Sequence, residues 1–214
     1  MMIGLPVFFL LAAGLAIFAS VYFARDARAR RELERAPILA IAAVRPGTTA
    51  RITGTVEYFD GELVAPLTGR TCAYYLVLIQ EYRSNGKSGS WVEILREEQH
   101  LDFLVRDATG VAQIRMDSPH ALVVHDHKTR SGTFDDATEI EAAFLRRFDK
   151  TSTNFLGLNR GLRYNEAVLE FGEKITVLGA TRAGEGEVRF VIEAPPEGKL
   201  LLSDEPGTVV ARRT

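Results

Sequence analysis

The sequence contains little of the chemistry on which most enzymes and metalloproteins depend. Its 214 residues include one cysteine, one tryptophan and four histidines. A single cysteine excludes an internal disulfide and any zinc site built from several cysteines. No G-x-S-x-G sequence is present, and the glycine-rich AGEGEV lacks the lysine and the spacing of a phosphate-binding loop. We therefore expect no cofactor and no enzymatic activity.

The chain also lacks an excess of charge of either sign. It has 26 Lys and Arg and 28 Asp and Glu, and its formal net charge is -2. Several of the cations lie in one short segment near the N-terminus, so the remainder is slightly acidic. Because nucleic-acid-binding domains usually present a basic face, we expect no nucleic acid among the partners.

Cys72 opens the apolar stretch CAYYLVLI. A nucleophilic cysteine needs an accessible, electropositive setting and a nearby base. A free cysteine among apolar residues behaves instead as a small, buried hydrophobe. We expect Cys72 to be buried and inert.

The motif HDHK and its neighbourhood supply three weak candidates for metal binding, His120, His125 and His127. In a strand, the last two would point to the same face. A zinc site needs three or four converging ligands, and no partner at a fixed spacing is visible. Surface histidines are the favoured interpretation, and no metal is expected.

The one long stretch without charge runs from Ile3 to Phe23. About 20 helical residues span the ~30 Å hydrocarbon core of a bilayer. A cleaved signal peptide would need a positively charged start, and only two methionines precede the run. The sequence therefore predicts a transmembrane anchor over residues 1–24 and a single-pass membrane protein.

A basic segment follows, and residues 25–45 are expected to form a juxtamembrane helix and linker. Its arginines are Arg25, Arg28, Arg30, Arg31 and Arg35. Because Lys and Arg beside a span stay on the cytoplasmic side, the rest of the chain is expected in the cytoplasm. The same arginines would also suit contact with anionic lipid headgroups.

The remaining sequence reads mostly as short strands. In ARITGTVEY, an apolar face is formed by Ala50, Ile52, Val56 and Tyr58. Gly54 in the same stretch marks a bulge or a bend. CAYYLVLIQEY is apolar on both faces, as in a central strand. NFLGLNRGLRY is expected to be an ordered loop.

One helix interrupts the strands, in DDATEIEAAFLRRF, where Ile140, Phe144 and Phe148 share a face. Many short strands with one helix predict a mostly β (α+β) fold. We expect a small antiparallel barrel or sandwich with an inserted helix, preceded by the transmembrane helix.

Three stretches occur in a familiar order: TGTVEYFDGELVAPLTGRTCAYY, FLVRDATGVAQI and RYNEAVLEFGEKITVLGAT. Together they resemble the GIDE domain, also called the beside-a-membrane domain, of membrane-anchored ubiquitin ligases and their prokaryotic relatives. The resemblance runs from about Ala50 to Ala180. We expect a GIDE-like β domain over residues 46–203, followed by a flexible tail over 204–214. The motif positions are Leu63, Ala65, Pro66, Leu67, Gly69, Cys72, Tyr75, Asp107, Gly110, Tyr164 and Glu166.

The resemblance implies a membrane-tethered domain that binds proteins. In the ligases, ubiquitin transfer is carried out by a RING finger that follows a second span. A RING needs a set of Cys and His ligands, so one cysteine predicts that none is present here. The motif is interpreted as mostly structural: Cys72 should fill the barrel wall, and Leu63 to Leu67 should form an exposed docking edge.

Three functions follow from these features. The first is a non-catalytic, membrane-anchored module that binds an unknown protein partner. The second is a component of a ubiquitin-ligase-like system whose RING comes from another chain. The third is a barrel that binds lipid headgroups. Relatives with two spans hold this domain on the non-cytoplasmic side, which is the alternative to the orientation predicted from charge.

Overall fold

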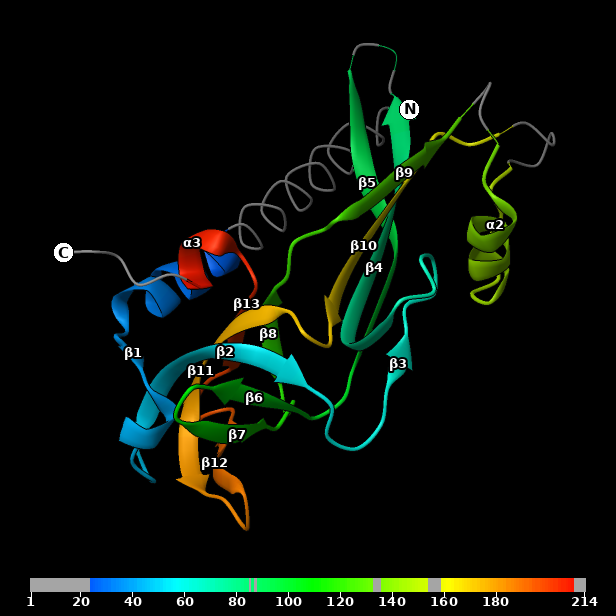
Figure 1. Ribbon diagram of the computed structural model, residues 1–214. Helices are drawn as coiled ribbons and strands as arrows, with labels where there is room; N and C mark the ends of the chain where they lie inside the picture. The colour runs from blue at the N-terminus through cyan, green and yellow to red at the C-terminus, as the bar shows by residue number, and fades with distance from the viewer. Residues whose placement is uncertain (1–23, 85, 87, 133–135, 154–158, 210–214) are drawn as a thin grey trace.

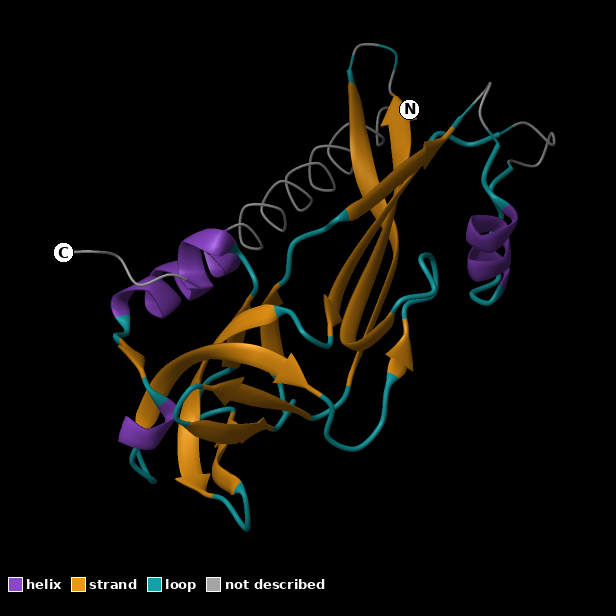
Figure 2. Cartoon of the chain, in the orientation of Figure 1, coloured by secondary structure: helices purple, strands orange, loops and turns teal. Residues whose placement is uncertain are grey.

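The computed structural model describes residues 24–84, 86, 88–132, 136–153 and 159–209. Strands dominate this part of the chain, with short helices at its margins (Figures 1 and 2). The predicted mostly β class is confirmed. No helix within the described residues is long and apolar enough to cross a bilayer, and the apolar run expected to be an anchor, residues 3–23, lies outside them.

A closed five-stranded barrel forms the lower part of the molecule in Figure 1. Around it, β2 pairs with β6, β6 with β7, β7 with β12, β12 with β11, and β11 again with β2. This is the strand order of the Greek-key barrel known as the OB fold. The barrel strands are β2 (Thr49–Glu57), β6 (Phe103–Asp107), β7 (Gly110–Ile114), β11 (Lys174–Ala183) and β12 (Val188–Glu193).

The predicted antiparallel barrel needs one correction, because β7 and β12 run parallel. Parallel neighbours need a long connection between them, and the chain between these two strands supplies it. Three short strands extend the barrel sheet, and two of the contacts that they make are also parallel. These strands are β1 (Ile38–Leu39), β8 (Pro119–Leu122) and β13 (Leu200–Ser203).

A second sheet rises from the barrel toward the top of Figure 1. Its order is β3-β4-β10-β9, with β5 also paired to β4. The first half of the long strand β4 is buried, as its apolar sequence predicted. Of the stretch NFLGLNRGLRY, expected to be an ordered loop, residues 154–158 lie outside the described part of the chain, and the last three residues belong to strand β10. The strands are β3 (Leu63–Val64), β4 (Thr71–Ser84), β5 (Gly89–His100), β9 (His127–Ser131) and β10 (Leu162–Glu170).

The second sheet is assembled from two insertions into the barrel. The first, β3 to β5, lies between β2 and β6 in the chain, and the second, with β9 and β10, lies between β7 and β11. The two insertions meet where β4 and β10 pair along most of their lengths. Each insertion therefore completes the sheet that the other begins.

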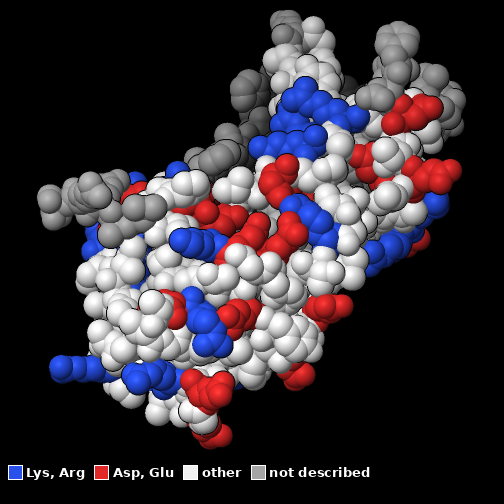
Figure 3. Space-filling model, viewed as in Figure 1, with Lys and Arg blue, Asp and Glu red and all other residues white. Residues whose placement is uncertain are grey.

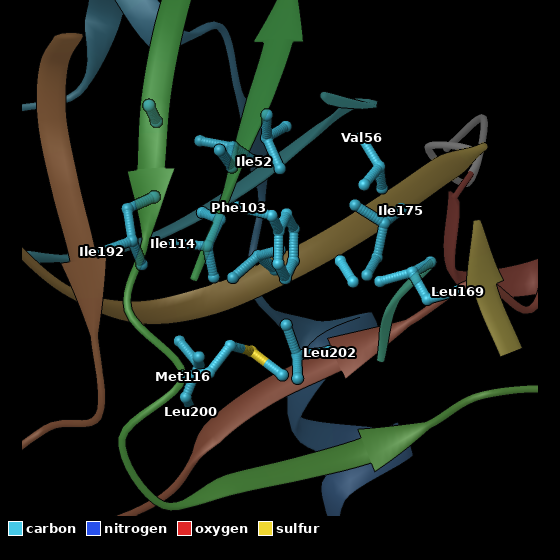
Figure 4. Close-up of a cluster of buried hydrophobic side chains, with 14 of the residues drawn as sticks. Ile52, Val56, Phe103, Ile114, Met116, Leu169, Ile175, Ile192, Leu200 and Leu202 are labelled. Carbon is cyan, nitrogen blue, oxygen red and sulfur yellow. The ribbon is translucent and has the colours of Figure 1, made fainter. Parts of the chain in front are cut away.

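The barrel interior is filled with aliphatic side chains around Phe103 (Figure 4). Ile52 and Ile175 lie beside it and are fully buried. Leu76 of β4 and Leu169 of β10 join the same cluster, so the base of the second sheet closes the barrel core. Burying each of these side chains contributes about 1.5–3 kcal/mol.

The alternation predicted for β2 holds along the strand and fails just beyond it. Ala50, Ile52 and Val56 are buried, whereas Tyr58, which follows the end of β2, is 56% exposed. Gly54 lies where β2 passes close to β6: an added Cβ would be 2.4 Å from the carbonyl oxygen of Arg106. The expected bend is therefore a close approach of two barrel strands.

The predicted inserted helix is α2 (Glu139–Arg146), which covers one face of the second sheet. Phe144 and Leu145 pack there against Tyr164. Ile140, predicted to share the buried face, is 56% exposed. The buried stripe of this short helix runs through Glu141, Phe144 and Leu145 instead.

Residues 24–35 form a helix against the outside of the barrel, where Leu33 packs on Leu178 and Leu201. The basic segment 25–45 continues through β1 and the 3-10 helix η1 (Ile41–Ala43). The stretch from residue 204, expected to be a flexible tail, contains α3 (Pro206–Val209), whose Thr208 is buried. Residues 210–214 lie outside the described part of the chain.

Candidate functional site

The motif residues between Leu63 and Cys72 form a hairpin at the base of the second sheet, with these two residues opposite each other. The Ala65 N–H donates to the Arg70 carbonyl at 2.9 Å, and the Gly69 N–H donates to the Ala65 carbonyl at 2.8 Å. Gly69 has φ +71°, a left-handed conformation that favours glycine. The turn chemistry of the motif therefore shapes a compact loop.

Glu166 of β10 is fully buried against this loop. Its Oε1 accepts a hydrogen bond from the Leu67 N–H at 2.8 Å. Its Oε2 accepts from the Thr68 N–H at 3.1 Å and from the Thr68 hydroxyl at 2.6 Å. A buried carboxylate is costly unless donors satisfy it. These charge-assisted bonds therefore fasten the loop to the second sheet.

Arg70 closes the outer side of the loop. It donates to both carboxylate oxygens of Asp126 and, at 2.8 Å, to Glu170. Its Nε also donates to the Thr68 hydroxyl at 3.1 Å. The hydrogen bond with Asp126 raises the pKa of Arg70 and lowers the pKa of Asp126. Arg70 thus joins the loop to the segment before β9 and to the end of β10.

Cys72 and Tyr75 point from β4 into the cluster under α2. Cys72 was expected in the barrel wall, but it belongs to the second sheet, because the motif strand leaves the barrel. Burial, with the nearby charge of Glu166, raises the pKa of the Cys72 thiol to about 11. The Tyr75 hydroxyl donates to Glu97 at 3.0 Å, and burial together with that bond raises the pKa of Tyr75.

The docking edge expected from Leu63 to Leu67 is mostly covered. Ala65 and Leu67 are buried, and Leu63 and Pro66 are partly buried. Val64 is exposed by 60% and faces solvent. The hairpin turns its apolar residues toward Glu166 and the second sheet, which leaves little apolar surface for a partner.

Asp107 and Gly110 form a second fixed turn, between β6 and β7. Asp107 accepts hydrogen bonds from the Thr109 N–H at 2.6 Å and the Gly110 N–H at 3.0 Å, and from the Ile41 N–H at 2.8 Å. Burial alone would raise the pKa of Asp107, but these bonds outweigh it and hold the pKa below its usual value. A Cβ at Gly110 would lie 2.8 Å from Arg189 Cδ.

Tyr164 is fully buried on β10, beneath α2. Burial raises the pKa of its hydroxyl to about 12, and the neighbouring Ser131 hydroxyl opposes that rise. Neither hydroxyl has a hydrogen bond of good geometry within the described residues. The Tyr164 ring therefore contributes packing more than polar contacts.

The three histidines do not converge. His120 Nε2 lies 2.9 Å from Asp26 Oδ1, so it contacts the helix of residues 24–35. His125 is partly buried before β9, and burial lowers its pKa. His127 begins β9. Across the described parts of the chain, no group of three His, Cys, Asp or Glu side chains is placed to hold a metal ion.

Two buried charges were not singled out from the sequence. Arg51 is 5% exposed and donates to the carbonyl oxygens of Ala36, at 2.9 Å, and Thr208. It thereby ties the end of the N-terminal helix and α3 to β2. Burial lowers the pKa of Arg51. No pattern in the sequence distinguishes it from a surface arginine.

Glu141 is the second buried charge, at 4% exposure. It forms a capping box with Thr138: the Thr138 N–H donates to Glu141 Oε2 at 2.8 Å, and the Glu141 N–H donates to the Thr138 hydroxyl at 3.2 Å. The Thr129 hydroxyl of β9 also donates to Glu141. The spacing T-x-x-E is a readable signal for this cap.

The motif residues are thus engaged inside the fold. The carboxylates of Glu166 and Asp107 are satisfied by backbone donors, and the Cys72 thiol is buried. This arrangement can hold a loop and a turn in fixed shapes. The Cys72 thiol and the Glu166 carboxylate are buried, and the partly exposed Asp107 carboxylate is engaged in the hydrogen bonds of its turn.

Comparison with known proteins adds one match. A family model named GIDE, with the description E3 ubiquitin ligase, matches residues 75–213. The matched region includes most of β4, the whole of β10 and four of the barrel strands. No curated protein and no solved structure matches the chain.

Proposed function

The chain belongs to the GIDE family, and on that premise we propose that it is a non-catalytic protein-interaction module anchored in a membrane by a single span. One observation carries the proposal: the motif groups capable of chemistry are used within the fold. Glu166 and Asp107 accept hydrogen bonds from the backbone, and Cys72 is buried with a raised pKa. Such a module offers a partner a rigid surface.

The family description supports an alternative, in which the chain takes part in a ubiquitin-transferring assembly. A RING finger holds two zinc ions with Cys and His ligands, and the sequence contains one cysteine. In this alternative the RING comes from another chain, and the present protein is its docking partner at the membrane.

A reconstituted transfer assay separates the two functions. The full chain in non-ionic detergent is incubated with ubiquitin and with activating and conjugating enzymes. A second reaction adds the proteins that co-purify with the chain from membranes. We expect co-purifying partners and no transfer in either reaction. Transfer by the chain alone contradicts the proposal, and transfer that needs a co-purified RING protein supports the alternative.

Lipid-headgroup binding is a second candidate, favoured by a groove between the N-terminal helix and the barrel. The groove has a volume of about 490 Å³. Its lining is Arg28, Arg31, Glu32, Arg35 and Ala36 from the N-terminal helix and its end, with Thr49 and Leu178 on the barrel side. The three arginines are spaced three and four residues apart and share one face of the helix. Arg30, on another face, pairs with Glu205. Contact of this groove with anionic headgroups would fit a position beside the bilayer.

Thermal unfolding with soluble short-chain lipids tests this candidate. We expect an anionic lipid, but not a zwitterionic one, to raise the Tm of the full chain in non-ionic detergent. Combined Arg28→Gln, Arg31→Gln and Arg35→Gln should abolish the rise. Combined Arg106→Gln, Arg115→Gln and Arg182→Gln, which removes equal charge from residues that do not line the groove, should not. Equal responses to both lipids would exclude a headgroup site.

A further inference from the structure

Three cationic side chains gather on the face of the second sheet that α2 leaves open. Lys128 and Arg130 lie on β9, and Arg163 and Asn165 lie directly opposite them on β10. Tyr164, between the last two, points into the cluster under α2, so its neighbours point to the other face. Figure 3 shows Lys and Arg side chains collected over this part of the sheet.

The positive charge of this group is not balanced by the protein. Arg130 and Arg163 are a directly opposed cross-strand pair of like charge, which is unfavourable by itself. Burial, and then the charge of Arg130, lower the pKa of Arg163. Within the described residues no carboxylate pairs with either arginine or with Lys128, whereas Arg106 and Arg182 each have a carboxylate partner. An anion from outside would relieve the repulsion.

Trp91 holds one of these cations in a fixed position. The Arg163 guanidinium carbon lies 4.1 Å from the centroid of the Trp91 ring, and that of Arg130 lies 5.8 Å from it. The Arg163 Nε is buried and has no hydrogen-bond partner in the described structure. A guanidinium stacked on an aromatic ring keeps its edge for a carboxylate or phosphate. The site is therefore organised before any ligand binds.

The size of the groove and its place at the sheet edge indicate the kind of ligand. The groove has a volume of about 190 Å³ and is lined by Lys128, Thr129, Arg130, Arg163 and Asn165. Pockets for small molecules usually have ~300–1,000 Å³, so this groove suits one or two charged groups of a larger ligand. Strand β9, which lines the groove, lies at the edge of the sheet, where an extended peptide can add as a further strand.

We propose that this face binds an extended acidic peptide segment of a partner protein, paired with β9. Lys128 and Arg130 are two residues apart, so they meet acidic side chains at alternate positions of such a segment. Arg163 binds one of the same carboxylates from the next strand. A single-stranded nucleic acid is the less favoured ligand, because Arg163 occupies one face of the Trp91 ring on which bases would stack. The inference rests on the proposed interaction function and identifies its surface.

The test uses the full chain in non-ionic detergent and a labelled ten-residue peptide of alternating Asp and Val. Fluorescence anisotropy of the peptide gives the Kd, and the emission of Trp91, the single tryptophan, reports on the site. We expect saturable binding that weakens as salt rises. Combined Arg130→Gln and Arg163→Gln should weaken binding about tenfold or more. Combined Arg106→Gln and Arg182→Gln, with the same charge change on the barrel, should leave the Kd unchanged.

Hydrogen exchange locates the peptide: the amides of residues 127–131 should become protected when it binds. The proposal is overturned by equal Kd values for the two double variants, by absence of that protection, or by equal binding of a peptide with Lys in place of Asp. Tighter binding of a single-stranded oligonucleotide through the same arginines also overturns it. If the peptide does not bind, and the same membrane proteins co-purify with both double variants, this site is wrong and the interaction function stands. If no partner is recovered by any form, the proposed function itself fails.

Discussion

Glu166 holds the loop from Ala65 to Arg70 by a single carboxylate, so its charge should affect stability strongly. Glu166→Gln keeps the size of the side chain but supplies only one acceptor oxygen, so its NH2 group faces the donors of either Leu67 or Thr68. We expect the free energy of unfolding to fall by about 3 kcal/mol. Chemical denaturation of the full chain measures it.

Glu185→Gln is the matched control, because Glu185 is exposed in the turn between β11 and β12. A surface change of this kind should stay within about 0.5 kcal/mol. Losses of the same size in both variants would mean that the buried hydrogen bonds of Glu166 do not hold the loop.

Cys72 should be unreactive in the native chain. Burial raises the pKa of its thiol to about 11, so little thiolate exists at pH 7. We expect a bulky thiol reagent to label the native chain far more slowly than the unfolded chain. Cys72→Ser should cost about 1 kcal/mol or more, because a hydroxyl enters an apolar cluster. Rapid labelling under native conditions would contradict the burial of this thiol.

Asp204 should make stability depend on pH. Burial raises its pKa to about 6, despite hydrogen bonds from the Val124 N–H at 2.9 and 3.2 Å. Between the ordinary pKa of about 3.9 and pH 6, the native state keeps a proton that the unfolded chain has lost. The contribution of Asp204 to stability is therefore present below about pH 4 and is lost as pH rises to 6.

Asp204→Asn should remove the loss of stability between about pH 4 and 6 and leave the chain more stable at pH 7. We expect a gain of up to about 2 kcal/mol, less than the full shift in pKa implies, because the side chain is partly exposed. Thermal unfolding of both proteins between pH 4 and 7 measures it. Parallel curves for the two proteins would assign the pH dependence to other groups.

At the scale of elements, barrel closure depends on the approach of β2 to β6. Gly54→Ala would place a methyl group 2.4 Å from the Arg106 carbonyl oxygen, where backbone cannot easily move. We expect a loss of about 2–3 kcal/mol or more, measured by denaturation. Gly132→Ala is the control, since nothing lies within 4 Å of a Cβ there. If Gly54→Ala lowers the free energy of unfolding no more than Gly132→Ala does, the barrel tolerates extra volume between β2 and β6.

Two strands of the second sheet show how far a sequence determines its elements. β4 was predictable because it is apolar on both faces. β10 was missed because Asn165 and Glu166 are buried polar residues that break the apolar pattern. The donors that satisfy Glu166 lie in a loop far away in the chain, so only the tertiary fold explains its burial.

The candidate sites were also predictable only in part from the sequence. The resemblance located Glu166 and Asp107, but their hydrogen bonds to Leu67 and Ile41 depend on packing between distant segments. The opposition of Arg130 and Arg163 was not readable either, because it depends on the register between β9 and β10.

At the scale of the whole molecule, the prediction to test is the side of the membrane on which the β domain lies. Five arginines between Arg25 and Arg35 follow an uncharged run, so the positive-inside rule predicts a cytoplasmic β domain. Alkaline phosphatase fused to Thr214 in a bacterial host should be inactive, and β-galactosidase fused there should be active. Changing all five arginines to Gln should weaken this preference. High phosphatase activity in the unchanged chain would place the domain on the opposite side, as in relatives with two spans.

The assembly of one sheet from two insertions also affects how the chain is made. β4 ends at Ser84, and its partner β10 begins only at Leu162. At synthesis rates of about 5–20 residues per second, the apolar strand β4 leaves the ribosome several seconds before β10 exists. Of its strand partners, only β3, which precedes it, and β5, which follows it directly, are available by then. One long edge of β4 therefore stays open during translation, and this interval is when the nascent chain is most exposed to mispairing and most dependent on chaperones.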